Sequence, residues 1–122
     1  MRAPGWTALL ALGVAVALFF EWHTDEVTVV LAVMCVLAVV VGAARPRSSL
    51  LGGAVLGYSI SFAHALSEAT GTMRPRYVDS APSTGDWIAM ALAGTFVMAI
   101  AWSAGLLRRK LESGGARSGA VR

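Results

Sequence analysis

Charged side chains are scarce in this 122-residue chain, at 14% of its residues, and four long stretches contain none. Soluble domains carry about 25% charged residues. The stretches that lack Asp, Glu, Lys and Arg have 18, 18, 20 and 21 residues and are Ala3–Phe20, Val27–Ala44, Ser48–Ser67 and Trp87–Leu107. A hydrocarbon core of about 30 Å is crossed by roughly 20 helical residues. The sequence therefore predicts an all-α fold, a membrane-embedded bundle of four helices.

Cysteine and proline are also sparse, and each absence excludes something. The one cysteine, Cys35, excludes an intrachain disulfide, and we interpret it as a small packing residue in the second stretch. No stretch has a proline beyond its second residue. The sequence therefore gives no sign of the broken helices that form many transporter sites.

Motifs that carry chemistry are missing as well. The chain has no glycine-rich phosphate loop, no nucleophile elbow, no cysteine pair and no HExxH zinc motif. We therefore expect a protein that is not an enzyme, with no catalytic residue, no cofactor and no resident metal ion.

Turn and capping signals set the expected limits of the helices. Gly71 predicts the end of the third helix, Arg45-Pro46-Arg47 a tight turn before it, and Ser83-Thr84-Gly85-Asp86 a capping box for the fourth. Thr24 is the expected N-cap of the second helix. The predicted helices cover about residues 5–21, 25–43, 49–69 and 86–109 of a single domain, 1–112. Residues 113–122 are predicted to be a disordered basic tail.

The positions of the basic residues predict the orientation. Eight of the ten lie before the first stretch, between the second and third, or after the fourth: Arg2, Arg45, Arg47, Arg108, Arg109, Lys110, Arg117 and Arg122. With four spans these regions fall on one side, and basic residues beside spans stay in the cytoplasm. We therefore expect an up-down-up-down bundle with both termini cytoplasmic. The net charge of +3 is explained by lipid, and we expect no nucleic-acid partner.

Small residues recur every fourth position in the third stretch, at Gly53, Gly57, Ser61 and Ala65. In lipid, such residues let helix backbones approach closely. The stripe therefore predicts a packing surface toward another helix, and we expect the fourth helix to lie against it. Internal packing is the favoured interpretation, and self-association of two copies through this helix is the alternative.

Ionisable residues inside or beside the spans define a candidate polar pocket on the outer side. Its members are Ser61, His64, Glu68, Glu21, His23 and Asp25. Three hypotheses compete for them. The favoured one is a neutral His64 hydrogen-bonded to Glu68 or Ser61 that holds helices together. The others are a proton-responsive site, and a divalent metal site in which His64 and Glu68 are joined by a ligand from the first connection.

The residues Thr24-Asp25-Glu26 and Arg45-Pro46-Arg47 carry a general resemblance. In both segments the chain resembles small bacterial four-span membrane proteins of unassigned function. The likeness covers mainly the first three helices. It implies a multi-pass protein of the bacterial cytoplasmic (inner) membrane, and it implies no activity and no site residues.

Two functions follow as expectations. The first is a non-enzymatic module for packing or association, either a homo-oligomer or a subunit of a larger complex. The alternative is a small oligomeric channel or transporter, with His64 and Glu68 lining an outward-facing polar pocket.

Overall fold

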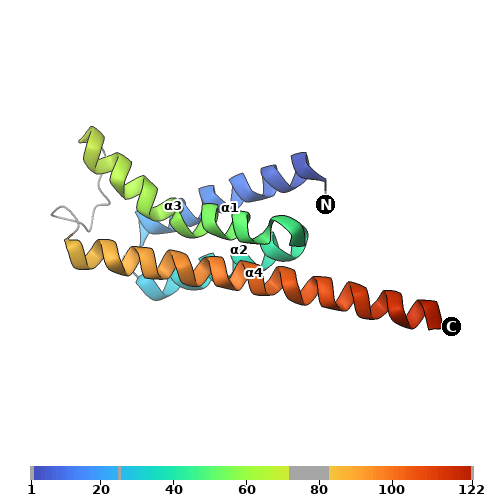
Figure 1. The fold of residues 1–122 in the computed structure, drawn as a ribbon. Coiled ribbons are helices and arrows are strands. Elements are labelled where there is room, and N and C mark those ends of the chain that lie inside the picture. Colours follow the sequence, from blue (N-terminus) through green and yellow to red (C-terminus); the bar gives the residue numbers. More distant parts are fainter. Residues whose placement is uncertain (1, 25, 72–82, 122) are drawn as a thin grey trace.

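The computed structural model describes residues 2–24, 26–71 and 83–121, with side chains as far as Gly114. Within these ranges the chain forms α1 (Ala3–His23), α2 (Val27–Ala44), a short 3₁₀ turn η1 (Pro46–Ser48), α3 (Ser49–Thr70) and α4 (Thr84–Val121). No strand occurs in the described residues. Four described helices are long and apolar enough to cross a membrane. The expected all-α bundle of four candidate membrane helices is thus confirmed (Figure 1).

Several helix ends follow from the local signals. Gly71 adopts a left-handed conformation with φ of 68°, and it ends α3. The Ser83 hydroxyl accepts from the Asp86 amide at 3.2 Å, and the Ser83 amide donates to the Asp86 carboxylate at 2.8 Å. These reciprocal bonds are the predicted capping box. The predicted turn at Arg45-Pro46-Arg47 is also confirmed, because η1 begins at Pro46.

Several helix limits differ by about two residues from the expectation, and two differences involve residues with a predicted role. Helix α2 begins at Val27, and Glu26 occupies the N-cap position in place of Thr24. The Thr24 hydroxyl still accepts from the Glu26 amide at 3.2 Å. The larger difference is at the other end of the chain, where α4 continues to Val121 through residues expected to be disordered. No proline follows Trp87, and none of the described glycines there has the positive φ that ends a helix.

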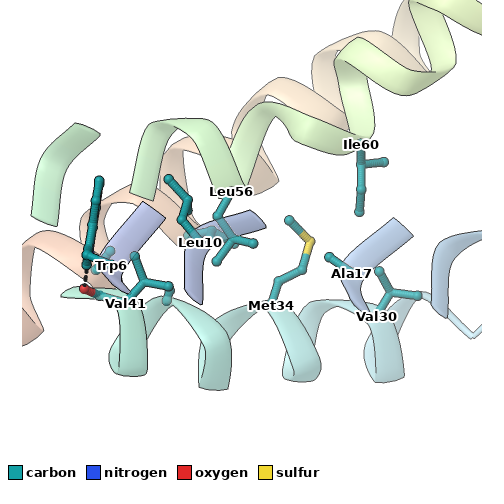
Figure 2. Close-up of a cluster of buried hydrophobic side chains, with 11 residues drawn as sticks. Trp6, Leu10, Ala17, Val30, Met34, Val41, Leu56 and Ile60 are labelled. Atoms are coloured by element: carbon teal, nitrogen blue, oxygen red, sulfur yellow. Dashed lines mark hydrogen bonds between the residues drawn. The ribbon is translucent and has the colours of Figure 1, made fainter. Parts of the chain in front are cut away.

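The four helices do not contact one another equally. Helix α4 lies against α2 and α3, and α1 also lies against α2 and α3, but the described parts of α1 and α4 do not touch. Helices α1 and α4 therefore flank the α2–α3 pair. A row of buried apolar side chains fills the centre, from Trp6 and Val41 at one end to Val30 and Ile60 at the other (Figure 2).

Trp6 has a larger role in packing than its place near the start of a span indicates. Its side chain is 5% exposed, and its indole Nε1–H donates to the Val41 carbonyl at 3.2 Å. The ring also lies against Gly52, where an added Cβ would stand 2.7 Å from Cζ2. Trp6 thus joins α1 to the end of α2 and the start of α3.

Helix α4 makes backbone-to-backbone contact with both of its neighbours. A Cβ added to Gly42 of α2 would collide with the Ala101 carbonyl, and one added to Gly57 of α3 would collide with the Gly94 carbonyl. At Gly105 an added Cβ would lie 2.5 Å from the Ser49 hydroxyl. Glycine is required at these positions because any side chain would push α4 away from the bundle.

The stripe expected on α3 follows the contact with α4 over only part of its length. Gly53 and Gly57 lie against α4, whereas Ser61 is half-buried and Ala65 is exposed. A four-residue step turns a helix by about 40° beyond a full circle, so three steps rotate the stripe by roughly 120°. The later turns of α3 also diverge from α4 (Figure 1). The stripe therefore leaves the contact surface before Ala65.

Replacing Gly57 with alanine tests the close approach of α3 and α4. We expect Gly57→Ala to lower the free energy of unfolding by about 1–3 kcal/mol, since the added methyl group overpacks the contact with Gly94. Thermal or dodecyl-sulfate unfolding in detergent micelles measures this loss. Gly114→Ala is the matched control, because its Cβ would meet nothing within 4 Å. Equal stability of the two variants would contradict the packing described.

Candidate functional site

The polar centre of the bundle is a pair formed by His64 of α3 and Glu21 of α1. His64 Nε2 and Glu21 Oε1 lie 2.9 Å apart, and the two side chains are only 10% and 18% exposed. A hydrogen on Nε2 donates to the carboxylate oxygen. The two residues are 43 positions apart in sequence, and their bond joins α1 to α3. The pair lies beyond Ala17 and Ile60, at the end of the apolar core.

Trp22 completes this site. Its ring stacks on the His64 imidazole, with centroids 4.9 Å apart and an angle of 29° between the planes. Glu21 and Trp22 are adjacent in sequence, so the last turn of α1 supplies both the acceptor and the stacking ring. The imidazole therefore has two partners from the last turn of α1, an indole that stacks on it and a carboxylate that hydrogen-bonds to it.

The partner of His64 differs from the one expected. The hydrogen bond of His64 is to Glu21 on another helix, and the hydroxyl of Ser61, which shares its helix, makes none with it. Glu68 is half-buried, and the buried Ser61 hydroxyl has no hydrogen-bond partner within the described part of the chain. The reason is the packing of α1 on α3, which brings the Glu21 carboxylate to the imidazole from the neighbouring helix.

His23 does not join the site, and Asp25 lies outside the described residues. His23 is exposed, its ring stacks on Phe19 at 4.3 Å, and its Nδ1 lies 2.8 Å from the Phe19 carbonyl oxygen. Two residues of helix correspond to a rotation of about 200°. Because Glu21 points toward α3, His23 is turned to the opposite side of α1.

The residues that the structure describes form no metal site with three ligands, because no three His, Cys, Asp or Glu side chains among them are grouped to hold an ion. The described pair offers one imidazole and one carboxylate. What this arrangement can do is hold a proton between His64 and Glu21 and tie α1 to α3. In a lipid environment, pairing of this kind offsets the cost of placing ionisable groups among apolar side chains.

A second polar link joins α3 to α4. The Tyr58 hydroxyl and the Thr95 hydroxyl share a hydrogen bond of 2.6 Å, and Thr95 also donates to the Ala91 carbonyl at 2.9 Å. The Tyr58 ring lies against Gly94, where an added Cβ would be 2.8 Å from Cδ1. Thr95 carried no signal in the sequence, because a lone threonine in a span most often bonds to its own helix.

Comparison with family models, curated proteins and solved structures gives no match for this chain. Functional inference therefore rests on its own residues and contacts.

A double-mutant cycle tests the link between α1 and α3. We expect His64→Ala alone to lower the free energy of unfolding by about 1–3 kcal/mol, because it removes the hydrogen bond between the imidazole and the Glu21 carboxylate. The cycle with Glu21→Ala should give a coupling energy of about 0.5–3 kcal/mol, measured by unfolding in detergent.

His23→Ala serves as the histidine control, since His23 is exposed and bonds only within its own helix. Its effect should stay within about 0.5 kcal/mol. Additive effects of the His64 and Glu21 substitutions would show that the pair contributes nothing.

Proposed function

We propose that this chain is a non-enzymatic protein of the bacterial cytoplasmic membrane that acts by association, as a homo-oligomer or as a subunit of a larger complex. The contacts of the polar side chains inside the bundle support a structural role for these side chains. His64 is engaged by Glu21 and Trp22, and Tyr58 by Thr95, so these side chains join helices of the same chain. Gly53 and Gly57 of α3 likewise face α4 within the chain.

The observation that carries the proposal of association is the length of α4. Its 38 residues extend about 57 Å at 1.5 Å per residue, whereas a hydrocarbon core is about 30 Å thick. Residues 108–121, here named the α4 extension, follow the last apolar stretch and project past the other helices (Figure 1).

The α4 extension is a poor helix on its own. It has 14 residues and contains Gly114, Gly115 and Gly119. Isolated helices shorter than about 12–15 residues are marginal in water, and each glycine costs about 1 kcal/mol relative to alanine. A partner that packs along residues 108–121 would supply the stabilisation that the chain itself does not.

For orientation we propose an up-down-up-down course with both termini in the cytoplasm. Charge supports it. The end of the bundle with the α2–α3 turn carries Arg45, Arg47 and the basic start of the α4 extension. The described acids other than Glu112 are Glu21, Glu26, Glu68 and Asp86, and they lie at helix ends away from that turn. Basic residues next to spans are retained in the cytoplasm.

Photo-crosslinking from the α4 extension tests association. We expect Ser113→p-benzoylphenylalanine, irradiated in native membranes, to give a discrete covalent adduct whose mass identifies a second copy or another subunit. The same residue at Ser83, which is exposed at the other end of α4, is the matched control and should give no such adduct. A chain that stays monomeric, with no adduct from position 113, would contradict the proposal.

The second candidate function is a small oligomeric channel or transporter. The observation that favours it is the buried Ser61 hydroxyl, which has no partner among the described residues and lies one turn from His64. Proton flux into liposomes separates the two candidates. Association alone predicts no flux above protein-free liposomes for either wild type or His64→Ala. Flux that is present in wild type and in His23→Ala, but lost in His64→Ala, would favour the channel.

A further inference from the structure

Basic residues of η1 and α4 are found in the region where α2, η1 and α4 contact one another. The Arg108 guanidinium donates to the Ala43 carbonyl near the end of α2, and Gly105 of α4 lies against Ser49 at the start of α3. Three further basic residues, Arg47, Arg109 and Lys110, are exposed on the same segments. We name Arg47, Arg109 and Lys110 the basic corner.

No described acid forms an ion pair with the basic corner. Glu112 is the one acid among the described residues after Asp86. It forms an ion pair with Arg108, whose Nε lies 3.0 Å from Glu112 Oε1. Arg45 lies over the Trp6 ring, with Cζ 5.6 Å from its centroid. Within the part of the chain that the structure describes, the side chains of Arg47, Arg109 and Lys110 form no hydrogen bond or ion pair. Three cations are thus left to attract an anion from outside.

Apolar side chains adjoin these cations along both segments. Leu50 and Leu51 follow Arg47 by three and four residues and are 50% and 62% exposed. Leu106 and Leu107 precede Lys110 by four and three residues and are 38% and 60% exposed. Residues three or four apart lie on the same face of a helix. Arg47 on one segment, and Arg109 and Lys110 on the other, therefore lie close in sequence to exposed leucines.

A surface that carries cations next to exposed leucines is suited to bind a molecule with a charged headgroup and an apolar tail. A free phosphate or a nucleic acid would engage the cations but would leave the leucines uncovered. We propose that the basic corner binds the headgroup of an anionic phospholipid, whose acyl chains lie along Leu50, Leu51, Leu106 and Leu107. This site goes beyond the proposed association. It uses Arg109 and Lys110 at the start of the α4 extension, so the partner would pack along the residues that follow Lys110.

Lipid retention by the purified full chain tests the site. The protein in a neutral detergent is titrated with phosphatidylglycerol or with zwitterionic phosphatidylcholine, and native mass spectrometry counts the bound lipids. We expect phosphatidylglycerol to bind at least about tenfold more tightly than phosphatidylcholine. Inorganic phosphate and glycerol 3-phosphate, at the same concentrations, should not displace it. Equal binding of the two lipids would overturn the proposal, and displacement by either soluble anion would assign the corner to a free phosphate.

Paired substitutions locate the binding. The variant Arg47→Gln with Arg109→Gln removes two cations of the corner, and Arg117→Gln with Arg122→Gln removes two from the chain end. We expect the first to weaken phosphatidylglycerol binding about tenfold or more, and the second to stay within about twofold of wild type. Equal losses would show that net charge, and not the corner, attracts the lipid. An unchanged affinity of the first variant, with its helical circular dichroism intact, would also overturn the site.

Discussion

The contact of α4 with the backbones of α2 and α3 is the interaction on which the rest of the bundle depends. In lipid, apolar side chains gain little from leaving the surrounding acyl chains, so helices associate through close packing and polar links. Gly42, Gly57 and Gly105 remove the side chains that would keep α4 at a distance. Once α4 lies there, the Tyr58 and Thr95 hydroxyls are close enough to bond, and the Arg108 guanidinium reaches the Ala43 carbonyl.

Helix α1 is attached in a different way. It does not touch the described part of α4, and it contacts only α2 and α3. Polar groups fasten it near both ends: the Trp6 indole bonds to the Val41 carbonyl, and Glu21 bonds to His64. Between them Leu10 and Ala17 pack into the common core. The pair of His64 and Glu21 thus has a structural position, since it closes one end of the α1–α3 contact.

Sequence patterns predicted what depends on neighbours along the chain. The four charge-free stretches became the four candidate membrane helices, and the Ser83–Asp86 capping box and the left-handed Gly71 formed as expected. Contacts between helices were harder to predict, because they depend on how each helix is rotated about its own axis. His64 was assigned to partners on its own helix because spacing in sequence says nothing about which neighbour faces it. Gly94 was missed for the same reason, since the sequence does not show which face of α4 meets α3. The extent of α4 was underestimated because basic and glycine-rich composition favours disorder but does not force a helix to end.

These contacts have their proposed meaning only if the chain lies across a bilayer with its basic end in the cytoplasm. Labelling of single cysteines in intact cells by a membrane-impermeant maleimide tests this directly, in a Cys35→Ala background. Ser83→Cys should react with the reagent outside the cells, and Ser113→Cys should react only after the membrane is permeabilised. Labelling of Ser113→Cys in intact cells, or equal labelling at both positions, would contradict the proposed orientation.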